Sequence, residues 1–292
     1  MKFRAHETFF IRKGWLSKGM RNVAQDPTVF MGAHGNPMDI LGIGANMVKS
    51  LRYWMQAVGL TVEPAAGRRI QTLTPLGQII SANDRYVEEM GTLWLLHYKL
   101  ASNKNDATAW YFFFNEFKLT EFTRDDFIVH IHNYLRMANE EVSERALEED
   151  YNCIVSTYVP RMKSNPEKAQ PESNIDCPLG ELGLIDITSK KDKKYKKCVP
   201  MKESIAPLIL LAVIIDQAGG ANEVKISTIQ GAACNAGKVF NLDIITLTNL
   251  LYKIELSGYI KVDRTAGLDV VKILTDMSFE ECVAEYYHAI NN

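Results

Sequence analysis

The sequence lacks the cysteine patterns of zinc sites and disulfide frameworks. Its five cysteines are scattered and form no C-x-x-C pair (Cys153, Cys177, Cys198, Cys234 and Cys282). An odd number of dispersed cysteines is typical of a reducing compartment. The chain also has no P-loop, G-x-G-x-x-G, H-E-x-x-H or G-x-S-x-G motif. We therefore expect no nucleotide cofactor and no ATP or dinucleotide chemistry.

Long apolar runs are missing as well. The longest, residues 205–215, contains Pro207 and is too short to span a bilayer. The N-terminus is polar and cationic and shows no apolar stretch of the kind found in signal peptides. We therefore expect a cytoplasmic protein without a membrane partner.

Charge is distributed unevenly along the 292 residues. Residues 1–83 carry ten Lys or Arg and four Asp or Glu, a net charge of +6, so the remainder must carry −8 to give the overall −2. A basic module on an acidic body is expected where one end of a protein binds a polyanion. With 47% hydrophobic residues the chain can bury sizeable cores, and its length favours about two domains.

The stretch from residue 46 to residue 58 predicts an amphipathic helix. Its apolar residues fall at offsets that place them on one helical face (Met47, Val48, Leu51, Trp54, Met55 and Val58). The opposite stripe is free of carboxylates and consists of Asn46, Lys49, Tyr53 and Gln56, flanked by Ser50 and Arg52. Such a face can approach phosphates and base edges without repulsion. The alternative is a solvated face that binds nothing.

Two short β-like segments follow this helix, at residues 60–62 and 70–73. The residues between them include Gly67 and the pair Arg68 and Arg69. A helix followed by a basic-tipped hairpin predicts the second half of a winged helix-turn-helix, in which the helix enters the major groove of DNA.

The first twenty-one residues mix cations with aromatic side chains. Arg12, Lys13, Lys18 and Arg21 alternate with phenylalanines and Trp15. This mixture suits a nucleic-acid surface, where aromatics stack and cations neutralise phosphate. It equally suits a segment that packs onto a domain.

The middle of the chain predicts helices. Residues 110–117 are almost entirely aromatic and predict a buried helix, and Thr123 predicts the N-cap of the next. The acidic residues 139–150 predict a solvated face or a surface for a basic partner. The lysine-rich residues 189–197 predict a solvated run or a DNA contact.

Residues 160–176 contain three prolines and almost no apolar residues, which predicts a linker or long loop. It separates an N-terminal domain, residues 1–159, from a C-terminal domain, residues 177–292.

The C-terminal domain repeats the pattern of helices followed by a hairpin. Helices are expected at 204–217, from Ser227, and at 243–256, and strands at 259–262 and 270–274. Acidic residues around this hairpin (Glu255, Asp263 and Asp269) suit a protein partner better than DNA. The expected fold is therefore mainly α with short β-hairpins (α+β), with winged helix-turn-helix modules at the N- and C-terminal ends joined by a helical middle.

The segment His6–Gly19 reads H-E-T-F-x-x-R-x-G-W-L-x-K-G. Together with further motifs it resembles the SspB-like family of bacterial DNA phosphorothioation systems (residues 42–60, TPLG at 74–77, GTLWLL at 91–96, 109–117, CPLGELGLI at 177–185 and TAGL at 265–268). The resemblance covers nearly the whole chain. It implies an accessory DNA-acting protein, with DNA nicking assigned to SspB members. The implied partners are duplex DNA, a cysteine desulfurase and ATP-using proteins of the modification complex.

If the chain nicks DNA, the best catalytic candidates lie in this signature. Phosphodiester hydrolysis needs an activated water, positive charge and a proton donor. His6 and Glu7 can supply a base or ligands for a divalent metal such as magnesium, and Arg12 and Lys18 can supply charge. Alternatively, His6 and Glu7 cap or cross-link the N-terminal segment.

A weaker nuclease pattern lies further along the chain. Asp216, Glu223 and Lys225 imitate the D, E-x-K spacing of many metal-dependent nucleases, although residues 224–226 equally predict a short strand.

The main hypothesis is a DNA-binding component of a phosphorothioation and phage-defence system that nicks one strand of duplex DNA for sulfur insertion. The alternatives are a non-enzymatic DNA-binding adaptor for the complex and a winged-helix transcriptional regulator. A homo-oligomer is compatible with each.

Overall fold

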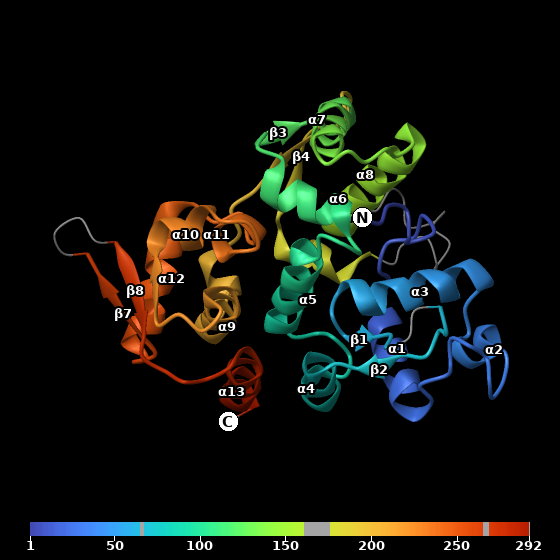
Figure 1. The fold of residues 1–292 in the computed structure, drawn as a ribbon, viewed down its shortest axis with the longest axis horizontal. Coiled ribbons are helices and arrows are strands. Elements are labelled where there is room, and N and C mark those ends of the chain that lie inside the picture. Colours follow the sequence, from blue (N-terminus) through green and yellow to red (C-terminus); the bar gives the residue numbers. More distant parts are fainter. Residues whose placement is uncertain (65–66, 161–175, 265–268, 292) are drawn as a thin grey trace, which may run out of the picture.

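The structure, a computed structural model, describes residues 1–64, 67–160, 176–264 and 269–291 (Figure 1). The predicted linker at 160–176 and the TAGL motif at 265–268 therefore lie largely or wholly outside the described residues. Helices predominate, and the described strands form small antiparallel sheets. The α+β class expected from the sequence is confirmed.

The N-terminal part consists of helices followed by a short hairpin: α1 (Trp15–Gln25), α2 (Pro37–Leu41), α3 (Ala45–Ala57), β1 (Thr61–Val62) and β2 (Thr72–Leu73). Strands β1 and β2 are antiparallel, with Thr61 opposite Leu73. The apolar face of α3 is buried as predicted, and Gly59 follows the helix with a left-handed φ of 74°. One residue beside the predicted polar stripe differs. Ser50 is fully buried, and its hydroxyl lies 3.5 Å from the carbonyl oxygen of Phe9.

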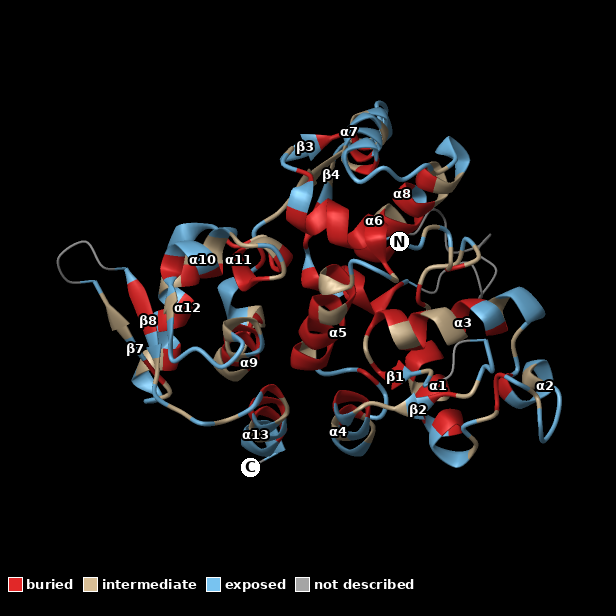
Figure 2. Ribbon diagram, in the orientation of Figure 1, coloured by how far each residue is buried: buried red, intermediate tan, exposed pale blue. Residues whose placement is uncertain are grey.

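The middle of the chain is helical: α4 (Pro75–Asn83), α5 (Met90–Ser102), α6 (Thr108–Tyr111), the π-helical turn η1 (Phe112–Glu116), α7 (Arg124–Met137) and α8 (Glu144–Tyr158). Helix α5 lies at the centre and is buried on nearly all sides (Figures 1 and 2). The aromatic stretch is buried as predicted, but as α6 followed by a π-helical turn rather than one regular helix. Thr123 caps α7 through a capping box with Asp126.

A small sheet joins residues from both sides of the predicted linker. Its described strands are β3 (Glu121–Phe122), β5 (Lys194–Lys197) and β4 (Ile185–Ser189), with β5 in the centre. The 3₁₀ turn η4 (Pro178–Leu182) packs against α8. The main chain after residue 176 thus shares a sheet and a helix contact with the main chain before residue 160.

The C-terminal part contains the elements η5 (Lys202–Ser204), α9 (Pro207–Ala218), β6 (Glu223–Lys225), α10 (Ile226–Gly231), α11 (Ala236–Val239), α12 (Ile244–Leu256), β7 (Ile260–Asp263), β8 (Val270–Ile273) and α13 (Phe279–Asn291). Strand β8 pairs with β6 on one side and β7 on the other. Glu223 and Lys225 therefore lie in a strand. Asp216 accepts hydrogen bonds from Tyr98 Oη (2.5 Å) and Lys99 Nζ (2.9 Å).

Helix α13 packs against helices from both halves of the chain. It packs against α9 and against α4 (Figure 1). The hydroxyl of Tyr286 accepts from the backbone N–H of Gly91 (3.2 Å), and the Tyr287 hydroxyl lies 2.5 Å from that of Thr92. Nowhere in the described ranges is a helix both long and apolar enough to span a bilayer.

Candidate nucleic-acid interface

A groove of about 770 Å³ lies along the exposed side of α3. It is lined by the N-terminal segment (Lys2, Ala5 and Glu7), by α3 (Val48, Lys49, Arg52, Tyr53 and Gln56), by the hairpin (Thr61, Val62, Glu63, Gly67 and Arg69), and by Phe30, Thr74 and Asp106. Elements far apart in the sequence therefore meet at one concave surface.

Six of the residues predicted to act on DNA line this groove: Glu7, Lys49, Arg52, Tyr53, Gln56 and Arg69. Asn46 and Arg68 are exposed on α3 and on the hairpin without lining it. The predicted carboxylate-free stripe of α3 therefore lines one side of the groove. However, the neighbouring elements bring Glu7, Glu63 and Asp106 into it.

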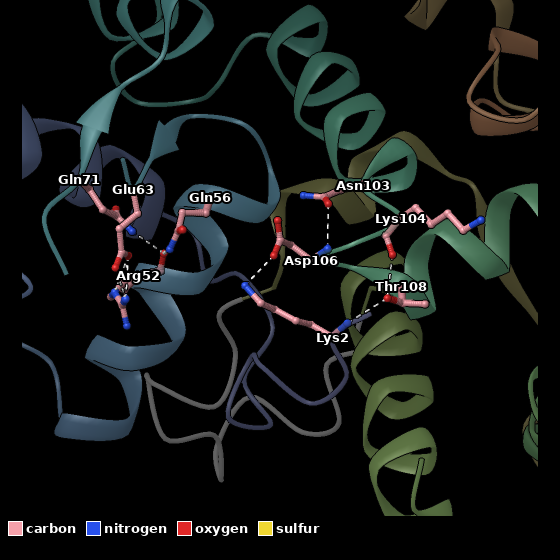
Figure 3. Close-up of polar contacts among 9 residues, drawn as sticks. All are labelled: Lys2, Arg52, Gln56, Glu63, Gln71, Asn103, Lys104, Asp106 and Thr108. Atoms are coloured by element: carbon pink, nitrogen blue, oxygen red, sulfur yellow. Dashed lines mark hydrogen bonds and ion pairs between the residues drawn. The ribbon is translucent and has the colours of Figure 1, made fainter. Parts of the chain in front are cut away.

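Arg52 is held in a bidentate ion pair with Glu63 (Figure 3). Its Nη2 donates to Glu63 Oε1 at 2.6 Å and its Nε donates to Oε2 at 3.0 Å. The backbone carbonyl of Arg52 accepts from the side-chain amides of Gln56 and Gln71. Because a bidentate pair neutralises the guanidinium and fixes its plane, Arg52 fastens the hairpin to α3.

The ion pair gives the hairpin a defined pH dependence. Burial raises the pKa of Glu63, but hydrogen bonds from Arg52 and from the backbone N–H groups of Arg69 and Gly67 outweigh it, so this pKa is lowered. The pair therefore stabilises the fold above the unfolded-state pKa, about 4.3, and this contribution is lost as the pH falls through the folded-state pKa.

Replacing Arg52 tests this pair. We expect Arg52→Met to be less stable than wild type at pH 7 in urea unfolding. The difference in unfolding free energy between the two proteins should be smaller at about pH 3 than at pH 7, because protonated Glu63 no longer needs a cation. Arg69→Met is the control, since its backbone N–H still donates to Glu63 Oε1 at 3.0 Å. If the difference in unfolding free energy between wild type and Arg52→Met does not change with pH, Arg52 does not stabilise the fold through ionised Glu63.

A second ion pair closes the other side of the groove. Lys2 Nζ lies 2.6 Å from Asp106 Oδ1, and the backbone N–H of Lys2 donates to Thr108 Oγ1 at 3.1 Å (Figure 3). This anchors the N-terminus to the start of α6. Of the cations lining the groove, Lys49 and Arg69 have no ion-pair partner among the described residues.

His6 lies inside the core and does not line the groove. Its side chain is 0% exposed, and its Nε2 is 2.7 Å from Asp150 Oδ1. The same oxygen accepts from the backbone N–H of Arg4 at 2.9 Å, and the imidazole stacks on Trp54 with centroids 6.0 Å apart. Burial raises the pKa of Asp150, against the lowering effect of His6 and Arg4. His6 therefore links the N-terminal segment to α8, which is the structural alternative to catalysis expected from the sequence.

Asp150 also corrects the prediction for the acidic stretch. Residues 139–150 suggest a solvated face or a partner surface, and several of them are exposed. Asp150 is instead buried, because it lies on the side of α8 that faces the N-terminal segment and binds His6 and Arg4.

Glu7 is half-buried and lines the groove. The residue has a φ of 50°, and its neighbours Arg4 and Thr8 also adopt left-handed φ values, 55° and 67°. Such backbone conformations are costly for residues other than glycine and are often retained at functional sites. No cation of the described residues lies within 4 Å of the Glu7 carboxylate.

The other signature cations lie outside the groove lining. The guanidinium of Arg12 sits over the rings of Phe9 and Trp15, 5.6 and 5.5 Å from their centroids. Lys18 Nζ donates to the carbonyl of Leu41 at 2.7 Å, which caps the end of α2. Lys13 faces Glu88 at 3.9 Å, and Arg21 is exposed on α1. Arg12 and Lys18 thus make local contacts that hold the N-terminal helices.

Residues 3–287 match the model of a family described as a protein of unknown function, DUF4007. The chain belongs to the DUF4007 family. Two solved structures share its fold. One is a magnesium ion-bound SspB crystal structure, with a TM-score of 0.84 and 23% identity over 100% of this chain and 89% of that chain. The other is an SspB crystal structure, with a TM-score of 0.83 and 24% identity over 99% and 87% of the two chains.

These matches confirm the resemblance to the SspB-like family that the sequence motifs indicated. At such identities the likeness shows a common fold. No curated protein matches the chain.

The residues of this DUF4007 member do not form a ready magnesium site. The described residues contain no group of three or more His, Cys, Asp or Glu side chains placed to hold a metal ion. In the groove, Glu63 and Asp106 are paired with Arg52 and Lys2, which leaves the carboxylate of Glu7. Magnesium needs a near-octahedral shell of oxygens, which one carboxylate does not supply.

Several DUF4007 motifs serve packing. In TPLG, Thr74 accepts from the backbone N–H of Gly77 as the N-cap of α4 and donates to the carbonyl of Gly59 at 2.6 Å. A Cβ on Gly77 would lie 2.1 Å from the carbonyl oxygen of Leu60. Asn115 of the aromatic motif bonds the carbonyls of Ala101 and Tyr111. These motifs hold the elements that carry the groove.

Sequence reasoning missed the groove residues that oppose its cations. Glu63 adds to the charge balance of residues 1–83, but its pairing with Arg52 has no motif, and Lys2 and Asp106 belong to no motif either. An acid at the start of the hairpin, eleven residues after Arg52, is a signal for the first pair. The pair of Lys2 with Asp106 spans 104 residues and leaves no local pattern.

Proposed function

We propose that this chain is a DNA-binding component of a bacterial DNA phosphorothioation system, and that the groove beside α3 receives the DNA. The observation that carries the proposal is the pair of unpartnered cations, Lys49 and Arg69, on a concave wall in the most basic part of the chain. The fold shared with SspB over nearly the full length supports the choice of system. Sulfur donation and ATP use would fall to separate partners, a cysteine desulfurase and ATP-using proteins.

In this proposal the N-terminal part acts as a winged helix-turn-helix. Helices α2 and α3 are joined by a turn that begins at Gly42, whose φ is 60°, and the hairpin β1–β2 follows α3 directly. Helix α3 then enters the major groove and the hairpin contacts the adjacent backbone. Lys49, Arg68 and Arg69 contact phosphates, while Asn46 and Gln56 face base edges. Tyr53 lines the groove, but burial of its hydroxyl, which raises the pKa of that group, withholds the hydroxyl from the bases. Arg52 keeps the two elements in register.

The C-terminal part has the same order of elements that winged helices use. Strand β6 lies between α9 and α10. Strands β7 and β8 follow α12 and form one sheet with β6. We propose that it forms a second winged-helix module. Its exposed helix face includes Ile245 (71% exposed) and Leu256 (88% exposed), which suits a protein partner better than a phosphate backbone.

Charge reversal in the groove tests DNA binding. For Lys49→Glu/Arg69→Glu we expect the Kd for a short duplex to rise about 100-fold or more, because each change removes a phosphate contact and adds repulsion. The slope of log Kd against log salt should become shallower by about two. Fluorescence anisotropy at several salt concentrations measures both.

The control is Lys225→Glu/Lys253→Glu, which changes the net charge equally on exposed residues of the C-terminal part. Urea midpoints of all variants establish that the fold is intact. Unchanged affinity and salt slope in the groove variant would overturn the proposed interface.

Strand nicking is the second candidate function, and Glu7 is the residue that favours it. Its carboxylate lines the groove without a cation beside it, on a left-handed backbone. In this role Glu7 takes a proton from a water whose oxygen bonds to phosphorus. The bond from phosphorus to the leaving sugar oxygen breaks, and that oxygen takes a proton from solvent. One strand is left with a phosphate end and a hydroxyl end.

Conversion of supercoiled plasmid to open circles tests this role. We expect Glu7→Gln to slow nicking about 100-fold or more, as expected for loss of a general base, while duplex affinity stays the same. Glu181→Gln changes an exposed carboxylate elsewhere and should be silent. Nicking at the wild-type rate in Glu7→Gln would remove Glu7 from catalysis. Absence of nicking by the wild-type chain, with DNA binding retained, would favour the adaptor.

A further inference from the structure

A second cavity, of about 330 Å³, lies between the helical middle and the C-terminal part. It shares no lining residue with the groove beside α3. Three of its lining residues are lysines from different elements: Lys118 follows η1, Lys197 ends β5, and Lys238 lies in α11. Cations from three separate elements thus meet in one concavity.

Lys197 is the most constrained of the three. Its Nζ donates to the carbonyls of Phe113 and Phe117, each at 2.6 Å, and lies 4.6 Å from the centroid of the Phe113 ring. These bonds use two of the three ammonium protons and leave one for a ligand. Burial, with a further contribution from the charge of Lys238, lowers the pKa of Lys197 to about 7. The ammonium is thus held in place without enough compensating negative charge.

Asp243 is the one carboxylate among the lining residues that the structure describes. None of the three lysines forms an ion pair with a described carboxylate. Asp243 lines the cavity, but its Oδ1 accepts from the backbone N–H of Thr246 at 2.7 Å and caps α12. Grouped lysines without a carboxylate partner are the arrangement that binds phosphate oxygens.

We propose that this cavity binds a phosphate group through Lys118, Lys197 and Lys238. The phosphate comes either from a DNA backbone that extends past the groove or from a free phosphate compound. In both cases the anion supplies the negative charge that the lysines lack, and one of its oxygens accepts a hydrogen bond from the remaining N–H of Lys197. Because Lys118 and Lys238 belong to different parts of the chain, the bound phosphate ties the helical middle to the C-terminal part.

Titration of the full chain with inorganic phosphate tests the site. Lys238→Gln is the main variant, since Lys197 bonds two carbonyls and its replacement is expected to impair folding. We expect calorimetry at pH 7 to show one phosphate per chain, and Lys238→Gln to weaken binding at least tenfold. Lys225→Gln, an exposed lysine of β6, is the matched control and should bind as wild type does.

The second part of the test measures binding of duplex DNA. If wild type does not bind inorganic phosphate but Lys238→Gln lowers duplex affinity and reduces the salt slope by about one, the site takes a backbone phosphate. If Lys238→Gln alters neither phosphate nor duplex binding, the proposal is overturned. Titration with inorganic phosphate does not involve the groove beside α3. Its result is therefore independent of the test on Lys49 and Arg69.

Discussion

A His6→Ala variant is expected to unfold at a much lower urea concentration than the wild-type chain. His6 is 0% exposed, and its ring bonds to Asp150, which is 1% exposed. Removing one partner of a buried pair leaves the other polar group without compensation, which costs about 3–5 kcal/mol. The lost stacking on Trp54 and the cavity left by the ring act in the same direction. Equilibrium urea unfolding followed by tryptophan fluorescence measures the effect.

The matched control is His34→Ala. His34 is 75% exposed and faces Asp26 at 3.2 Å, so its removal should cost less than about 0.5 kcal/mol. Equal midpoints for His6→Ala and wild type would show that the buried pair does not stabilise the fold. The same expectation bears on any nicking assay. A loss of activity in His6→Ala reports folding unless the variant is shown to be folded.

A Gly77→Ala variant is expected to be destabilised by about 3 kcal/mol. The added Cβ would lie 2.1 Å from the carbonyl oxygen of Leu60. Both this carbonyl and the Cα of Gly77 that would carry the Cβ belong to the backbone. Neither can move without disturbing the bond from the Thr74 N–H to that same carbonyl. Since α4 follows the hairpin directly, the groove should be distorted as well, and duplex affinity should fall with stability.

Two further glycines calibrate this result. Gly231→Ala meets open space at the end of α10 and should change stability by a few tenths of a kcal/mol at most. Gly19→Ala meets the flexible end of Met55, 2.5 Å from its sulfur, and should have an intermediate effect. A Gly77→Ala variant as stable as Gly231→Ala would mean that the chain accommodates the extra carbon at this contact.

Local patterns predicted the elements that depend on nearby residues. The apolar spacing of α3, the stop at Gly59, the N-cap at Thr123 and the order of a helix followed by a hairpin at 46–73 and at 243–274 are confirmed, because each is specified within a few residues. The polar stripe of α3 was predicted for the same reason. Four of its residues, Lys49, Arg52, Tyr53 and Gln56, line one groove.

Pairings between distant residues could not be predicted in this way. His6 and Asp150 lie 144 residues apart, and nothing near either shows that both face the core. The lysine-rich run suggested solvation or DNA contact, yet Lys197 turns inward because the end of the π-helical turn leaves carbonyls that need a donor. Whether a charged residue is free or paired depends on the tertiary structure.

Helix α13 is synthesised after the elements it packs against. Until Tyr286 and Tyr287 have emerged from the ribosome, the N–H of Gly91 lacks its acceptor, Thr92 lacks one of its partners, and the sides of α4 and α9 that α13 covers remain open. Domains that fold during synthesis expose such surfaces to chaperones and to neighbouring chains. Folding of this chain is therefore completed only when translation has passed α13, and nascent chains stalled before it should be selectively bound by chaperones.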